Sequence, residues 1–425
     1  MSRSEWVGAP YQRHDSKEVV LIRHAQSAAN AENAWNGRTD GPLSESGEAS
    51  LGPLAQRLAR WDFDVVLSSP LGRAMQTARS FATEVVAEEG FIEIDLGDWE
   101  GMAFTEVQER HGEQLAEAIS SRKLPLGGTG ETLDDVASRA HHAVDDLFQR
   151  LEPGQRAAVV THGGLIQSVM HRLLRGKGRR VHAFAANTSI TRILHQFGRP
   201  RLATFNDVGH LGSRPQTVEA HLVSGDPVLA LVRHGQTRAN TERRWQGHGD
   251  WDLDELGHRQ AEALGEWYGV VETVYSSPLK RAWSTAERIA KDGITSVADL
   301  RELNMGEWEG LTTDEIAERW PGIMETIYRD GVDLRRGEIG ETWGELTVRF
   351  AAAVTGFETS QTEPTGVVSH GGAIRSFVSG LTETIDTHAE SLYTPANTSV
   401  THVALTEKGP EIIDYAVAAH LEAIQ

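Results

Sequence analysis

The sequence predicts an α/β fold arranged as two tandem domains. With 425 residues, the chain is too long for one ordinary hydrophobic core and suits two domains of about 200 residues each. An apolar run of strand length, VVLIRHAQS at residues 19–27, recurs as ALVRHGQT at residues 230–237. The repeat offset is 234 − 24 = 210 positions. Segments typical of strands and of helices alternate through both halves, so we expect one α/β domain to be present twice.

Both strand-like runs end in an arginine and a histidine. The residues are Arg23 and His24 in one half and Arg233 and His234 in the other, followed six positions after each histidine by Asn30 and Asn240. A run of Val, Ile and Leu without polar alternation is typical of a strand buried on both faces of a parallel sheet. Ligands of such sheets bind at the carboxyl ends of the strands. A single histidine at this place would read as an ordinary core residue, but its recurrence favours a site.

The second motif is a strand that ends in Ser-Ser-Pro, at residues 65–70 and 274–278. Before it, a loop leads to a helix for which Ser44 and Asp254 are the predicted caps. After it, a further helix carries Arg73 or Arg281 in its first turn. Helix amino ends attract anions, and an arginine adds a bidentate donor. One such arginine would be read as a solvated charge, whereas its recurrence indicates an anion site.

The third motif ends in Gly-x-Trp-Glu-Gly, at residues 97–101 and 306–310. Aligning these turns superimposes Glu93 on Glu302. Two further shared carboxylates, Glu100 and Glu309, lie inside the turn, and we expect them to brace it. The tripeptide Gly-Glu-Thr then opens an amphipathic helix in each half, at residues 130–132 and 340–342.

The fourth motif is a buried strand that ends in His162 or His370 and two glycines, which allow close approach of the backbone to a ligand. Closing strands are expected to begin near residues 187 and 397 and to end at His210 and His420. The domain boundary is expected just after the first of these. The predicted division is a lead-in at 1–17, domain 1 at 18–212, a linker at 213–225 and domain 2 at 226–425.

These four motifs, in one order and in two copies, resemble the histidine phosphatase superfamily, which also contains the cofactor-dependent phosphoglycerate mutases. The resemblance covers nearly the whole chain twice. It implies two tandem three-layer α/β/α sandwich domains, each with a mainly parallel, phosphoglycerate mutase-like sheet. The alternation of strands and helices fits that architecture independently.

The resemblance also implies roles for the site residues in hydrolysis of phosphate monoesters. His24 and His234 would attack phosphorus and form a phosphohistidine. Glu93 and Glu302 would protonate the leaving oxygen and then activate water. The groups that would hold the phosphoryl oxygens are Arg23, Asn30, Arg73 and His162 in domain 1 and Arg233, Asn240, Arg281 and His370 in domain 2. Nearby arginines favour an ionised glutamate, so burial or the substrate must oppose them for the acid role.

Composition limits the classes of molecule that the chain is expected to bind. The chain carries a net charge of −20, 39% hydrophobic residues and no cysteine. That charge opposes non-specific binding to nucleic acid or an anionic membrane, and the missing cysteine excludes thiolate chemistry. No apolar run reaches the length of a spanning helix, and the amino terminus does not resemble a signal peptide. We therefore expect a cytoplasmic enzyme acting on a small phosphorylated metabolite.

Three alternatives remain open at this stage. A metallohydrolase is disfavoured because no His-x-x-x-His or His-x-His pair lies at a strand end, so neither a metal nor another cofactor is expected. A tandem module that only binds phosphorylated ligands, or one such domain beside a catalytic one, is disfavoured by the complete residue set in each half. A mutase-like phosphotransferase would resemble the branch with a longer insertion before the second histidine, whereas the separations here are 162 − 93 = 69 and 370 − 302 = 68 residues.

The two halves differ near the motifs. Domain 1 has Ala25 and Ile92 where domain 2 has Gly235 and Arg301. A methyl group at position 25 is expected to narrow the approach to phosphate, and the missing arginine removes a charge near the acid. Domain 2 is therefore expected to be the more active. No motif identifies the substrate, because the stretches at 102–128 and 311–338 differ between the halves.

Overall fold

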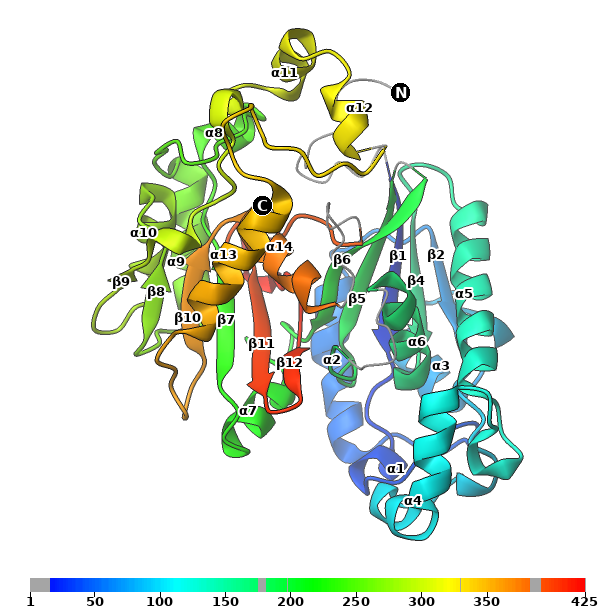
Figure 1. Cartoon of the computed structure of the whole chain (residues 1–425). Helices are drawn as coiled ribbons and strands as arrows, with labels where there is room; N and C mark the ends of the chain where they lie inside the picture. The colour runs from blue at the N-terminus through cyan, green and yellow to red at the C-terminus, as the bar shows by residue number, and fades with distance from the viewer. Residues whose placement is uncertain (1–15, 175–180, 197, 329, 383–390, 425) are drawn as a thin grey trace.

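The computed structural model of the chain describes residues 16–174, 181–196, 198–328, 330–382 and 391–424. It contains two six-stranded mixed sheets, each covered by helices. The two domains lie side by side, domain 1 in blue to green and domain 2 in green to red (Figure 1). Residues 1–15 of the predicted lead-in lie outside the described part, and Lys17 already belongs to the first strand. No helix in the described ranges is long and apolar enough to cross a membrane.

Domain 1 has a sheet with the strand order β3-β2-β4-β1-β5-β6. The first four strands are parallel, and β5 and β6 are antiparallel additions at one edge. The strands are β1 (Lys17–Arg23), β2 (Val65–Ser68), β3 (Val86–Ala87), β4 (Arg156–Thr161), β5 (Ile190–Gln196) and β6 (Arg199–Asp207). The helices are α1 (Ala28–Ala31), α2 (Glu45–Leu58), α3 (Gly72–Arg79), α4 (Phe104–Ser121), α5 (Leu133–Arg150) and α6 (Gly163–Leu173), with 3₁₀ turns η3 (Glu89–Phe91), η4 (Gly97–Trp99) and η5 (Leu126–Gly128).

The central strand β1 is buried on both faces, as its apolar run predicts. Val19 and Leu21 pack with the side chains of α5 and α6, whereas Val20 and Ile22 pack with those of α2 and α3. All four side chains are fully buried. The helices therefore form a layer on each face of the sheet, and the predicted three-layer α/β/α sandwich is confirmed.

Domain 2 repeats this plan with the strand order β12-β11-β7-β10-β8-β9. Its strands are β7 (Val228–Arg233), β8 (Val274–Ser276), β9 (Thr295–Ser296), β10 (Thr365–Ser369), β11 (Val400–Thr406) and β12 (Gly409–Ile412). Its helices are α8 (Arg238–Thr241), α9 (Glu255–Tyr268), α10 (Lys280–Ala286), α11 (Thr313–Arg319), α12 (Ile323–Tyr328), α13 (Trp343–Thr355) and α14 (Gly371–Leu381), with 3₁₀ turns η6 (Ala298–Leu300), η7 (Gly306–Trp308) and η8 (Ala419–Ala423). Both predicted caps are present, because Ser44 and Asp254 accept backbone hydrogen bonds at the starts of α2 and α9.

The junction between the domains differs in detail from the sequence expectation. The stretch at 213–225 contains helix α7 (Gln216–Val223), whose Val218 and Leu222 pack against domain 2. His210 lies beyond the end of β6, and His420 lies in the 3₁₀ turn η8 rather than at the end of a strand. Each imidazole instead contacts a threonine hydroxyl beside the site of its own domain, at Thr188 and Thr398. The predicted domain bounds stay a prediction.

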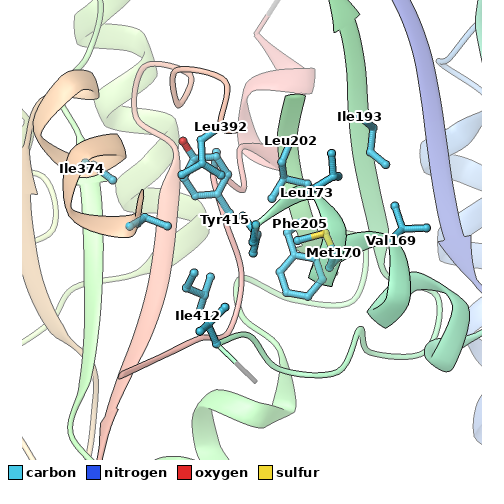
Figure 2. Close-up of a cluster of buried hydrophobic side chains, with 14 of the residues drawn as sticks. Val169, Met170, Leu173, Ile193, Leu202, Phe205, Ile374, Leu392, Ile412 and Tyr415 are labelled. Carbon is cyan, nitrogen blue, oxygen red and sulfur yellow. The ribbon is translucent and has the colours of Figure 1, made fainter. Parts of the chain in front are cut away.

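The domains join along the antiparallel edges of their sheets. Leu202 of β6 pairs with the segment at 391–393, and Ile412 of β12 pairs with the segment at 181–183. Backbone hydrogen bonds also join Phe205 to Tyr415 in both directions. Figure 2 shows the apolar side chains gathered around these contacts from both domains. Each domain thus covers an exposed sheet edge of the other, a feature that protects against unwanted strand pairing.

Candidate active site

The motifs predicted from the sequence meet at the carboxyl ends of the central strands in each domain. In domain 1, His24 follows β1 and His162 follows β4, and their ring centroids are 4.9 Å apart. The rings of His234 and His370 are 5.1 Å apart in domain 2. The structure therefore brings together residues separated by more than a hundred positions.

The first histidine of each pair is held in one tautomer by its own backbone. Nδ1 of His24 lies 2.7 Å from the carbonyl oxygen of Ala25, and Nδ1 of His234 lies 2.6 Å from that of Gly235. A carbonyl oxygen only accepts, so Nδ1 carries the hydrogen and Nε2 keeps its lone pair. Burial, together with the neighbouring arginines, lowers the pKa of both imidazoles well below its usual value. Both rings are therefore neutral at neutral pH.

The second histidine is held by a serine from the Ser-Ser-Pro motif. Nε2 of His162 is 2.7 Å from Oγ of Ser69, and Nε2 of His370 is 2.8 Å from Oγ of Ser277. Nδ1 of His162 is buried and has no protein partner. The sequence predicts that these serines lie at a strand end, but it does not predict their contact with the histidine.

The first arginine of each domain lies beside the histidine pair and is held by a backbone carbonyl. Nη1 of Arg23 donates to the carbonyl oxygen of Ala185 at 2.6 Å, and Nη1 of Arg233 donates to that of Pro395 at 2.5 Å. The Nε atoms of both arginines are buried without a protein partner. Burial lowers the pKa of Arg233 to about 10 even though Glu302 opposes the shift. The guanidinium stays charged at neutral pH, with a donor left over for a ligand.

The second arginine of each domain is fixed by loop carbonyls. Nη1 and Nη2 of Arg73 donate to Thr39 and Gly37 at 2.9 and 2.6 Å. Arg281 makes the matching bonds to Gly249 and Gly247 at 2.7 and 2.9 Å. Glu100 accepts backbone hydrogen bonds from the same loop in domain 1, so its predicted bracing role agrees with the geometry.

The glutamate lies beside the glycines that follow the second histidine. In domain 1, Glu93 accepts hydrogen bonds from the backbone N–H groups of Ile94 and Gly164 at 2.9 and 3.1 Å. Burial raises the pKa of Glu93 above its usual value, although these bonds and the two arginines oppose the shift. Glu302 accepts the matching bonds from Leu303 and Gly372, both at 2.9 Å. Burial thus favours a protonated acid in domain 1, the point that the sequence left open.

The predicted asparagines have a structural use as well. The side-chain oxygen of Asn30 accepts from the backbone of Ser27, and that of Asn240 accepts from Thr237, so each completes the capping box of a short helix. Any donor to a ligand would be the amide nitrogen.

Several residues of the site were not predicted. Nδ2 of Asn187 donates to the carbonyl oxygen of His24 at 2.9 Å, and Asn397 makes the same bond to His234. Arg139 and Arg349 each clamp the backbone of the glutamate segment to the Gly-Glu-Thr carboxylate, Glu131 or Glu341. These pairs recur at 397 − 187 = 210 and 349 − 139 = 210. The constant offset between the two repeats is therefore a signal that could have identified these four residues from the sequence.

The second arginine points differently in the two domains. Nε of Arg73 donates to Nε2 of His24 at 3.3 Å, whereas Nε of Arg281 donates to Nδ1 of His370 at 3.2 Å. In domain 1 the free lone pair of the first histidine is therefore occupied by a donor. In domain 2 that donor is turned to the second histidine.

The described residues contain no group of three or more His, Asp or Glu side chains arranged to hold a metal ion. The site instead presents cationic and neutral donors around two neutral imidazoles and one carboxyl group. Such an arrangement is suited to a tetrahedral dianion.

The model of the histidine phosphatase superfamily (branch 1) matches the chain at residues 19–208 and again at 229–417. The chain belongs to this superfamily. Membership over two regions confirms the prediction of a duplicated domain. Together with relatives named as phosphatases, it confirms the prediction that the chain is an enzyme, a phosphoric monoester hydrolase.

Two curated relatives align with about half of this histidine phosphatase chain. A metal-independent phosphoserine phosphatase of Arabidopsis thaliana is 34% identical over 204 residues, which are 46% of the chain and 84% of the relative. Phosphoserine phosphatase 1 of Hydrogenobacter thermophilus is 32% identical over 210 residues, 48% of the chain and 98% of the relative. Among solved structures, YhfR of Bacillus stearothermophilus is 28% identical, covers 46% of the chain and 98% of its own length, and has a TM-score of 0.43.

The difference at position 25 does not act as the sequence suggested. A Cβ added at the matching Gly235 would lie 2.6 Å from the carbonyl oxygen of Gly257 and 3.2 Å from Leu253. It would therefore face helix α9 and the loop before it rather than the histidines. The fully buried Ala25 occupies the matching place in domain 1. Its methyl group is thus directed at the packing around α2, and the expected narrowing of the phosphate site is not supported.

Proposed function

We propose that each domain hydrolyses phosphate monoesters of small metabolites through a phosphohistidine, without a metal ion. The observation that carries this proposal is the set of buried nitrogen atoms without protein partners around a neutral histidine, namely the donors Nε of Arg23 and Nε of Arg233 and the ring nitrogen Nδ1 of His162. Buried polar groups are rarely left unpaired, and a bound phosphate would satisfy these donors. The names of the relatives favour the same substrate class.

In the first step, Nε2 of His24 or His234 attacks phosphorus in line with the leaving oxygen. The N–P bond forms as the P–O bond to the alcohol breaks. The arginines and the second histidine hold the three equatorial oxygens and stabilise the charge on them. The hydrogen on Nδ1, held by the carbonyl oxygen of residue 25 or 235, supports the positive charge that develops on the ring.

Glu93 and Glu302 are assigned the proton transfers. The carboxylic acid gives its proton to the departing alkoxide in the first step. In the second step, the carboxylate takes a proton from water while the water oxygen attacks phosphorus and the N–P bond breaks. The raised pKa of Glu93 supports the acid half of this cycle.

We further propose that domain 2 is the more active with small aryl phosphates. In domain 1 the bond from Nε of Arg73 to Nε2 of His24 must break before the imidazole can attack. Arg281 leaves Nε2 of the proposed nucleophile His234 free, because its Nε is bound instead to Nδ1 of His370. That second bond must open only for His370 to contact a phosphoryl oxygen.

The test uses the full chain with His24→Ala, His234→Ala and both substitutions together. His234→Ala should remove most turnover of p-nitrophenyl phosphate and His24→Ala the smaller part. The double variant should be inactive, because loss of a nucleophile costs several powers of ten in rate. The opposite ranking would contradict the proposed order of the domains, and full activity in the double variant would contradict the mechanism.

A further inference from the structure

The first strand-end arginine of domain 2 has a second arginine beside it, Arg375 of helix α14. The position recurs in domain 1 as Gln167, since 375 − 167 = 208 equals the offset 370 − 162 = 208 of the second histidines. Arg375 lies one helical turn after Gly371, on the same face of the helix. A Cβ at Gly371 would lie only 3.1 Å from Nε of Arg233. Arg375 therefore lies next to the phosphate-binding group of the site.

The guanidinium of Arg375 is held in place but is not neutralised by any contact described. Its Nη1 donates to Oγ1 of Thr394 at 3.2 Å, and its Cζ lies 4.8 Å from the ring centre of Trp343. Its Nε is buried and has no protein partner. Trp343 corresponds to Leu133 in domain 1 at the shared offset of 210, so the platform under the cation is also particular to domain 2. A cation fixed by a hydroxyl and an aromatic face keeps its charge for another partner.

Domain 1 contributes to this part of the domain 2 site. The backbone of Leu202 accepts from Tyr393 and donates to Ser391, both at 2.8 Å, and so holds the segment that leads to Thr394. Arg201 precedes Leu202 on β6. Burial raises the pKa of Tyr393 above its usual value, and Arg201, Arg375 and Arg233 oppose that shift. Arginines from both domains thus act on one tyrosine beside the site.

From this arrangement, we infer that domain 2 takes phosphate monoesters whose alcohol portion carries a carboxylate, held by Arg375, whereas domain 1 takes monoesters without that requirement. The inference rests on the proposed function of the site. Arg233 and Arg375 are like charges side by side, which is unfavourable unless an anion lies between or across them. The phosphoryl group would pair with Arg233. A carboxylate a few bonds away in the same substrate would accept a charge-assisted hydrogen bond from Arg375. In domain 1 the neutral amide of Gln167 offers no such charge.

The test compares O-phospho-L-serine with phosphoethanolamine, which differ only in the carboxylate. The full chain carrying His24→Ala reports on domain 2, and the full chain carrying His234→Ala reports on domain 1. The quantity measured is the ratio of kcat/KM for the two substrates. In the domain 2 reporter we expect Arg375→Gln to lower this ratio by about tenfold or more, mainly through KM. Arg375→Lys should retain part of the preference, because it keeps the charge.

The reciprocal change, Gln167→Arg in the domain 1 reporter, should raise the ratio. The matched control is Arg259→Gln, which also removes one positive charge but lies on the exposed surface of α9, away from the site. A ratio that stays within about twofold in Arg375→Gln would overturn the inference, as would an equal fall in the Arg259→Gln control. If the proposed function is wrong, the result is different. The folded reporter then shows no turnover of either substrate that depends on its remaining histidine.

Discussion

Arg57 offers a test of how the two domains depend on each other. Its guanidinium makes two hydrogen bonds to Asp207 of domain 1, at 2.9 and 2.7 Å, and reaches Glu422 of domain 2 at 2.9 Å. The side chains of Arg57 and Asp207 are only 7% and 5% exposed. Arg57→Ala would leave a buried carboxylate without its cation, and breaking a buried pair in this way costs about 3–5 kcal/mol. We therefore expect the free energy of unfolding at pH 7 to fall by that amount.

The pH dependence follows from the pKa of Asp207. Burial alone would raise that pKa, but Arg57 and the N–H of Gly209 outweigh burial and hold it below its usual value. A depressed carboxyl pKa stabilises the fold above the unfolded pKa of about 3.9, and this stability is lost as the pH falls through the folded pKa. Arg57→Ala removes the largest of the effects that oppose burial and leaves the weaker hydrogen bond from Gly209, so the native pKa of Asp207 rises. The difference in stability between wild type and variant should therefore shrink between about pH 7 and pH 4.

Urea titrations followed by tryptophan fluorescence at several pH values would measure both effects, because Trp61 lies beside Arg57. Arg60→Ala, an exposed arginine just beyond the same helix, is the control and should change stability by less than about 0.5 kcal/mol. A loss below about 1 kcal/mol in Arg57→Ala, or a loss that does not depend on pH, would refute the assignment of a buried ion pair at the domain junction.

Two further predictions concern the chemistry. Phosphate release from p-nitrophenyl phosphate should persist in excess chelator; loss of activity that a divalent ion restores would contradict a metal-independent reaction. In the His234→Ala reporter, kcat for an alkyl phosphate should fall as the pH rises through the pKa of Glu93, which burial raises, because only the protonated acid can serve the leaving group. Glu93→Gln should slow the alkyl phosphate by about a hundredfold or more and flatten that basic limb, with a smaller effect on p-nitrophenyl phosphate; an unchanged pH profile would show that another group supplies the proton.

Much of the fold was predictable because its central strands are buried on both faces. A continuous apolar run such as residues 19–22 is typical of a strand buried on both faces. Its recurrence at a fixed offset identified the duplication. The motif residues were predictable for a related reason, since each lies where a strand ends, and parallel strands end at one edge of the sheet.

The contacts between domains were not predictable from pattern alone. The edge strands that hold Leu202 and Ile412 against the other domain look like ordinary sheet edges in sequence. Arg57 falls on a helix where an arginine would usually be solvated, and its partners are 150 and 365 positions away. The direction of the methyl group at Ala25 depends on the packing of the following helix, so the expected effect on phosphate could not be judged without the structure.

The central claim is that His234 becomes phosphorylated during turnover. The most direct measurement mixes the full chain with a monoester carrying a radiolabelled phosphate, quenches the reaction in alkali within the first turnover, and maps the label by peptide. The account predicts alkali-stable, acid-labile phosphate on the peptide that contains His234, and its loss from that peptide in a folded His234→Ala chain. Label that is acid-stable, or that stays on domain 2 after this substitution, would contradict the account.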